Sequence, residues 1–197
     1  MAKVISEDIG KFYQHYPKVA AVITAQADGR CNAMAAAWHT SLSFEPPIYG
    51  VSISPKRFTY QLIADSKEFG VNFLPFEKVE QVVLTGGVSG REIDKIQSFN
   101  IPADKPVKTG APILKDAYAA YECRLIDDSE YGDHRWLVGE IVAVHVLEEA
   151  FTPDEAVDLN RITPVLYLAR DIYVAAAQDT VRHIDREVCV RQALKED

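Results

Sequence analysis

Long apolar runs are missing from this 197-residue sequence, and none approaches the ~18 residues of a membrane-spanning helix. Positive charge is also scarce, because 21 Lys and Arg residues face 29 Asp and Glu residues and leave a formal net charge of −8. Nucleic-acid phosphates need a basic surface, so this charge argues against a general nucleic-acid-binding protein. The opening residues MAKVISEDIG are too acidic and too polar for a signal peptide. We therefore expect a soluble, cytoplasmic protein with no nucleic-acid or membrane partner.

Cysteine is also rare. The three residues Cys31, Cys123 and Cys189 are far apart and form no C-x-x-C pair or Cys/His ligand spacing. This argues against a zinc or iron–sulfur site, so we predict no metal and expect reduced, mostly buried thiols. With 48% hydrophobic and 25% charged residues, the composition is that of an ordinary globular protein. The length suits a single domain over residues 1–197.

Common nucleotide-binding and hydrolase motifs are absent too. The stretch Gly86–Arg91 resembles a nucleophile elbow, but Arg91 stands where the pattern needs a glycine. The sequence has no G-x-G-x-x-G spacing at this point and lacks the Gly-Lys-Ser/Thr end of a P-loop. A nicotinamide cofactor, if one binds, must use another kind of surface.

Short strands dominate what is present. Asp28-Gly29 predicts a tight hairpin turn, and residues 117–126 alternate between apolar and polar as a half-buried antiparallel strand does. We expect further strands over 19–25, 48–53, 69–74, 136–147, 165–168 and 172–175. Residues 32–43 are expected to be a strand leading into an irregular stretch, with an acidic turn at 127–133 and a loop at 100–112. Helices are expected over 7–16, 58–66, 77–84, a short stretch ending near 99, and 179–194. This order favours a mainly β (α+β) fold, an antiparallel barrel with peripheral helices.

The stretch from Asn32 to Thr59 has an unusual mixture of residues. Small residues surround Trp38, and the stretch ends on a hydroxyl and basic cluster: Ser52, Ser54, Lys56, Arg57 and Thr59. Small residues let the backbone approach a ring edge, while hydroxyls, Arg and free N–H groups at a helix start hold phosphate oxygens. This pattern indicates a flavin mononucleotide (FMN) site. The alternatives are an ordinary core tryptophan and an ordinary polar turn before a helix.

Several pieces, taken in order, resemble the flavin reductase-like family with the FMN-binding split-barrel fold, which includes flavoredoxin. The resemblance covers about residues 17–147, while the strands and helix of 160–197 lie outside it. The matching pieces are Asn32-Ala-Met34, Trp38, Ser43–Pro47, Ser52–Thr59, Asn72, Ser89–Lys95 and Gly132-Asp-His134.

The resemblance implies a role for each matching position. Residues at the flavin ring would be Asn32, Ala33, Met34, Ala35 and Trp38, acting mainly through backbone groups. Residues at the phosphate and the pocket rim would be Ser52, Ile53, Ser54, Arg57, Thr59, Asn72, Ser89, Gly90, Arg91 and Lys95. His134 would lie near the ring where the nicotinamide stacks, which makes it the candidate catalytic residue. The family also implies a homodimer, with FMN rather than FAD as cofactor.

Three functions are compatible with this resemblance. The first is an NAD(P)H:flavin oxidoreductase, an enzyme that passes hydride from NAD(P)H to flavin and onward to an acceptor. The second is a flavoredoxin-type FMN electron carrier that a protein partner reduces. The third is a flavin-binding protein without turnover. The choice between NADH and NADPH and the identity of the acceptor stay open.

Overall fold

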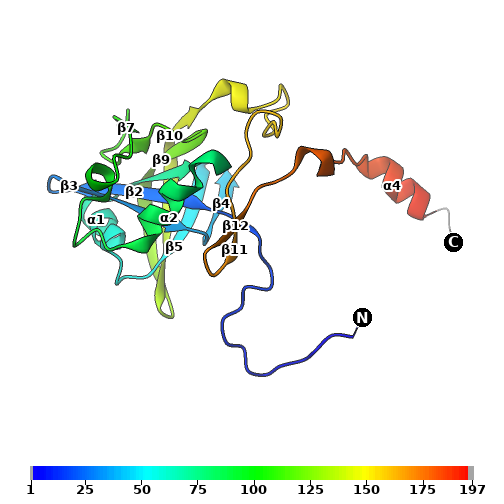
Figure 1. The fold of residues 1–197 in the computed structure, drawn as a ribbon, viewed down its shortest axis with the longest axis horizontal. Coiled ribbons are helices and arrows are strands. Elements are labelled where there is room, and N and C mark those ends of the chain that lie inside the picture. Colours follow the sequence, from blue (N-terminus) through cyan, green and yellow to red (C-terminus); the bar gives the residue numbers. More distant parts are fainter. Residues whose placement is uncertain (1, 195–197) are drawn as a thin grey trace.

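The computed structural model describes residues 2–194. Its centre is a seven-stranded antiparallel sheet with the order β3-β2-β6-β9-β10-β5-β4 (Figure 1). The strands are β2 (Ala21–Ala27), β3 (Arg30–Ala36), β4 (His39–Phe44), β5 (Pro47–Ile53), β6 (Glu68–Phe73), β9 (Ala119–Tyr131) and β10 (His134–Val146). The predicted antiparallel β fold with peripheral helices is confirmed.

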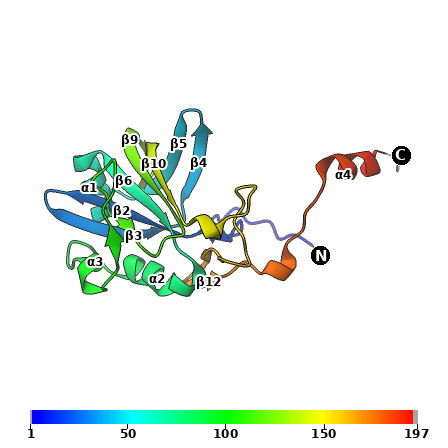
Figure 2. The same ribbon diagram turned by 90° about the horizontal axis from the view of Figure 1, so that it is seen from above.

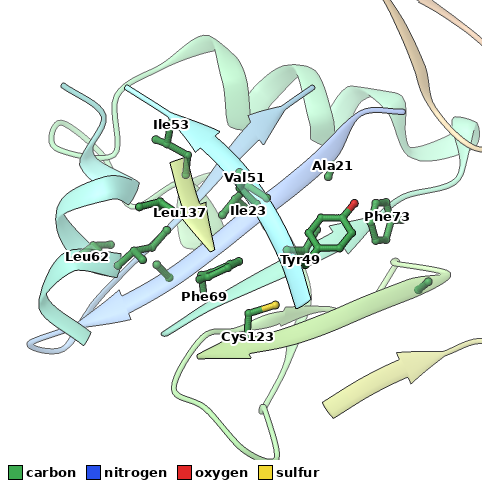
Figure 3. Close-up of a cluster of buried hydrophobic side chains, with 14 of the residues drawn as sticks. Ala21, Ile23, Tyr49, Val51, Ile53, Leu62, Phe69, Phe73, Cys123 and Leu137 are labelled. Carbon is green, nitrogen blue, oxygen red and sulfur yellow. The ribbon is translucent and has the colours of Figure 1, made fainter. Parts of the chain in front are cut away.

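The sheet curls around one apolar core (Figure 3). Strands β2, β5, β6 and β10 each send a side chain into it, for example Ile23, Val51, Phe69 and Leu137, all fully buried. Gly139 permits this packing, because a Cβ there would lie 2.5 Å from the Phe69 ring. Burial of such side chains stabilises the fold by about 1.5–3 kcal/mol each relative to exposure.

The two edges of the sheet are consecutive in the chain. Strands β3 and β4 lie at opposite ends of the strand order but are separated in sequence by Ala37 and Trp38 alone. The segment 32–43, predicted as a strand leading into an irregular stretch, therefore contains a second strand, since the chain leaves one edge and joins the other at this point. The backbone N–H of Ser52 on β5 donates to the Trp38 carbonyl at 2.8 Å and fixes this crossing.

Helices cover the β2–β3 part of the sheet (Figure 2). Helix α1 (Phe58–Ser66) packs on β2 and β3, α2 (Val79–Gly87) packs mainly on β3, and the short α3 (Lys95–Ser98) also contacts β3. A second core beneath α2 contains Val22, Leu74, Val82 and Leu114. The turn η1 (Phe76–Lys78) leads into α2, and the small pair β7 (Ala103–Asp104) and β8 (Ile113–Leu114) follows α3. The predicted loop over 100–112 thus contains a short strand.

A buried carboxylate holds the loop after β7. Glu122 on β9 is fully buried and accepts hydrogen bonds from the backbone N–H groups of Val107, Lys108 and Thr109 and from His145 Nε2. Burial alone would raise the pKa of Glu122, but these donors outweigh it and lower the pKa to about 2. The charged carboxylate therefore anchors the loop.

The chain ends in an arm that extends from the body (Figure 1). After η2 (Glu148–Ala150), the strands β11 (Leu166–Ala169) and β12 (Ile172–Val174) form a small sheet with β1 (Lys18–Val19). The arm then contains η3 (Gln178–Thr180) and α4 (Arg186–Ala193). No helix within residues 2–194 is long and apolar enough to cross a membrane.

Four local predictions are wrong. Residues 7–16 are not helical, and the acidic stretch 127–131 continues β9, so the turn contains just Gly132 and Asp133. The last helix begins at Arg186 and not near Asp179, because Asp185 accepts a hydrogen bond from the Val188 N–H at its start. The three cysteines are free, but Cys123 alone among them is buried in the described structure.

Candidate functional site

One cavity of about 490 Å³ gathers most of the predicted site residues. It lies where the chain passes from β3 to β4, and its walls come from β3, the end of β5, the start of α1, the segment after α2 and the start of β10. Of the predicted residues, those that line it are Asn32, Met34, Ala35, Trp38, Ser52, Ile53, Ser54, Arg57, Thr59, Ser89, Gly90, Lys95 and His134. Residues separated by about 100 positions in sequence thus share one site.

One end of the cavity suits an anion. Helix α1 begins at Phe58, and the Arg57 side chain does not cap it, so the first-turn N–H groups are available. The side chains of Ser52, Ser54 and Arg57 lie beside this helix start. The first turn carries no acidic residue that would repel a phosphate. Hydroxyl, guanidinium and backbone donors of this kind suit a phosphate group.

The wall beside this helix start contains an unpaired buried acceptor. Asn32 is 2% exposed, and its Nδ2 donates to Thr59 Oγ1 at 2.8 Å. Its Oδ1 is buried without a hydrogen-bond partner among the described residues. Gly90 packs against this amide so closely that a Cβ there would lie 2.1 Å from Asn32 Oδ1. A buried acceptor without a donor is costly, so this part of the cavity wall carries an energetic penalty as well as tight packing.

A buried lysine adds positive charge. Lys95 is 3% exposed, and its ammonium donates to the carbonyls of Ala33 at 3.0 Å and Thr85 at 2.5 Å. Burial, together with the nearby Arg57, lowers the pKa of Lys95 to about 8. The group thus ties β3 to the end of α2 and contributes a cation to the cavity wall.

The other end of the cavity is aromatic. The rings of Trp38 and His134 are 4.8 Å apart, although the two residues come from opposite ends of the predicted motif series. The Trp38 indole N–H donates to the Tyr16 hydroxyl at 2.7 Å. His134 Nδ1 bonds Asp133 Oδ1 at 2.7 Å, and this hydrogen bond lowers the pKa of Asp133. A flat conjugated ring system suits such walls.

Three predicted site residues do not line the cavity. Asn72 is fully buried in the sheet, where Nδ2 donates to the Val22 carbonyl and Oδ1 accepts from the Leu114 N–H, so its amide has a structural role. Ala33 contributes its carbonyl to Lys95. Arg91 points elsewhere and donates to the Lys56 carbonyl at 2.7 Å.

The tyrosines of the cavity were not among the predicted site residues. Tyr13 and Tyr16 precede β1, and Tyr167 lies on β11, yet all three line the aromatic end. The run Phe-Tyr-Gln-His-Tyr at 12–16 was a usable signal, since three closely spaced aromatic residues are unusual in a polar terminal segment. Lys56, Phe58, Ala36, Ala37 and residues 85–88 also contribute to the walls.

The two ends together fit a phosphorylated, flat aromatic group, as a flavin is. The helix start with its donors and the Trp38–His134 ring pair line the same cavity. The protein is thus of the flavin-binding class. The sequence model described as "Flavin reductase like domain" matches residues 13–176, so the chain belongs to the flavin reductase-like family. Its fold is the split barrel of that family.

Comparison with individual proteins agrees with this family. An uncharacterized protein of Aeropyrum pernix is 36% identical over 156 residues, which are 79% of this chain and 59% of that protein. An FMN-binding protein of Thermus thermophilus, solved with bound 1-cyclohex-2-enone, is 36% identical with a TM-score of 0.83, covering 93% of this chain and 99% of its own. An FMN-binding protein of Thermus thermophilus has also been solved with bound p-hydroxybenzaldehyde. Flavoredoxin from Methanosarcina acetivorans is 26% identical with a TM-score of 0.83, covering 96% and 100%.

Proposed function

We propose that the chain is an FMN-binding NAD(P)H:flavin oxidoreductase. The observation that carries this proposal is the single cavity in which a helix start with hydroxyl and guanidinium donors faces a Trp38–His134 aromatic end. FMN has one phosphate and one ring system, which match these two ends without the second phosphate and adenine of FAD. Membership of the flavin reductase-like family supports a redox role.

The residues of the chain bind and orient the reactants. Ser52, Ser54, Arg57 and Thr59 hold the phosphate, and Lys95 lies close enough to Arg57 to add its charge. The β3 backbone from Asn32 to Ala35 borders the ring. A flavin held by these residues would supply the redox chemistry, namely hydride uptake from a nicotinamide and onward transfer of electrons. Trp38 and His134 set the stacking geometry for the nicotinamide, which makes His134 a positioning residue for turnover.

The visible spectrum of the purified protein tests this proposal directly. We expect flavin absorption bands, from copurified or added FMN, that bleach when NADH or NADPH is added without oxygen. A protein that binds no FMN would refute the proposed cofactor. A protein that binds FMN but is not bleached by either nicotinamide would refute the reductase step.

A flavoredoxin-type electron carrier is the second candidate, supported by the structural similarity to the Methanosarcina flavoredoxin. Such a carrier takes electrons from a protein partner and not from a nicotinamide. Bound FMN that resists NADH and NADPH but is reduced by a reduced ferredoxin would favour it. Bound FMN that resists all three donors would favour a flavin-binding protein without turnover.

Small conjugated carbonyl compounds are a further ligand class for this site. The Thermus protein binds 1-cyclohex-2-enone and p-hydroxybenzaldehyde in structures that match this chain over 93% of its length. We propose that the aromatic end of the present cavity admits ligands of the same kind above the cofactor.

A homodimer is proposed from the exposed apolar residues near the other end of the barrel. Val144 and Val146 on β10 are 56% and 58% exposed and, with Thr40 and Ser41 of β4, line a second cavity. Exposed apolar surface of this kind favours burial against another chain. A Val144→Glu/Val146→Glu protein should sediment as a monomer, while Val107→Glu, at an exposed loop valine, should behave as the unchanged protein. A dimer that survives the double change would refute this interface.

A further inference from the structure

The Tyr16 hydroxyl has an unusual hydrogen-bonding state. An indole N–H can only donate, so in the 2.7 Å contact between Trp38 Nε1 and Tyr16 Oη the phenol oxygen is the acceptor. The phenol hydrogen is therefore free to donate elsewhere. Within residues 2–194, no other side-chain hydrogen bond involves this hydroxyl.

The surroundings of Tyr16 hold its ring at the cavity wall. Its ring lies 5.3 Å from Tyr13 and 5.9 Å from Tyr167, with both of these tyrosines also lining the cavity. Phe12 stacks on the indole of Trp38 at 6.5 Å. Burial raises the pKa of Tyr16 above its ordinary value, so the phenol keeps its proton at neutral pH.

We propose that Tyr16, oriented by Trp38, is the hydrogen-bond donor to the carbonyl oxygen of a small conjugated carbonyl ligand at the aromatic end of the cavity. The inference rests on the proposed function, in which the flavin ring lies at the aromatic end and the carbonyl ligand lies above it. It assigns a specificity role to the segment before β1, which lies outside the motif series of the family resemblance.

The chemistry of this end decides the ligand class. Its walls of Tyr13, Tyr16, Trp38, His134 and Tyr167 favour a flat conjugated ring, and the Tyr16 hydroxyl, whose oxygen Trp38 already holds, needs an oxygen acceptor for its hydrogen. The basic residues of the cavity, by contrast, lie at the helix start on α1 and at Lys95. A ligand with a conjugated ring and a carbonyl oxygen satisfies both features of the aromatic end, whereas a second phosphate would not.

Calorimetric titration of the FMN-loaded protein with p-hydroxybenzaldehyde tests the assignment. Tyr16→Phe keeps the ring and removes the donor, so we expect the dissociation constant of the probe to rise about 2- to 12-fold, the effect of one neutral hydrogen bond. Tyr173→Phe is the matched control, because Tyr173 packs 5.2 Å from Tyr167 but does not line this cavity. It should leave the constant unchanged.

Two further measurements separate the possible failures. FMN titration should show that the unchanged protein and Tyr16→Phe both bind FMN, which also shows that the variant is folded. Loss of FMN binding by the unchanged protein would overturn the proposed function and this inference together. FMN binding combined with equal probe affinity in both proteins would overturn the inference alone. The probe p-cresol, which lacks the carbonyl, should bind both proteins equally; a loss like that of p-hydroxybenzaldehyde would assign the donor to the ring hydroxyl and refute the carbonyl contact.

Discussion

Replacing Gly90 with alanine should weaken flavin binding through a single steric contact. A Cβ at Gly90 would lie 2.1 Å from Oδ1 and 2.4 Å from Cγ of Asn32, far inside normal contact distance. Asn32 cannot move aside easily, because it is 2% exposed and bonded to Thr59. Overpacking of this kind costs about 1–3 kcal/mol of folding free energy, and the share that falls on the ligand-bound cavity raises the dissociation constant of FMN by at most about 150-fold. The midpoint of thermal unfolding should fall as well.

The same cavity wall offers a matched control. A Cβ at Gly87, at the end of α2, would meet nothing within 4 Å, so Gly87→Ala should leave FMN affinity unchanged. Fluorescence titration of FMN measures both variants. In an Asn32→Ala background the cost of Gly90→Ala should shrink, because the clashing atoms are gone. Equal FMN affinity and equal unfolding midpoints for Gly90→Ala and the unchanged protein would refute the argument.

Three further changes have defined outcomes. Because the pKa of Lys95 is about 8 and a phosphate nearby favours the charged amine, FMN binding at pH 8–9 should take up a proton; calorimetry in buffers of different ionisation enthalpy should show this uptake in the unchanged protein and not in Lys95→Met. His134→Ala should lower the rate of NAD(P)H oxidation about 10- to 100-fold while FMN still binds, and unchanged turnover would remove its role. Glu122→Gln should cost about 2–4 kcal/mol of unfolding free energy above pH 4.5. Since the pKa of Glu122 falls from 4.5 to about 2 on folding, this difference should vanish as the pH drops towards 2, and a pH-independent difference in denaturant titrations would contradict the linkage.

Local sequence patterns predicted the strands and α1 well. The alternation over 117–126 and the Asp28-Gly29 turn act between neighbouring residues, and both occur in β9 and in the β2–β3 hairpin. The acidic stretch after Ile126 does not form the predicted turn. It pairs with the first residues of β10, and this pairing stabilises an extended chain whatever its charge. Tertiary pairing outweighed local propensity there.

In the site, too, local patterns could be predicted from the sequence and tertiary contacts could not. The helix start at Phe58 and the hydroxyls before it form one continuous segment, so the sequence could predict the anion end. The tyrosines at 13, 16 and 167 are brought together by the pairing of β1 with β11, which no local pattern specifies. Asn72 was predicted as a site residue because it matches the motif series. In the structure its amide instead holds the sheet together through the Val22 carbonyl and the Leu114 N–H.

The hydrogen bond from the Ser52 N–H to the Trp38 carbonyl fixes the position of Trp38 relative to β5. Trp38 borders the aromatic end of the cavity. Ser52, on β5, and Ser54, just after β5, border the anion end, so this short stretch of backbone sets the distance between the aromatic end and the anion end. If FMN is the cofactor, as proposed, a flavin without its phosphate would leave the far end empty, and a longer chain between ring and phosphate would overshoot it. The barrel would then select its cofactor by length as well as by chemistry.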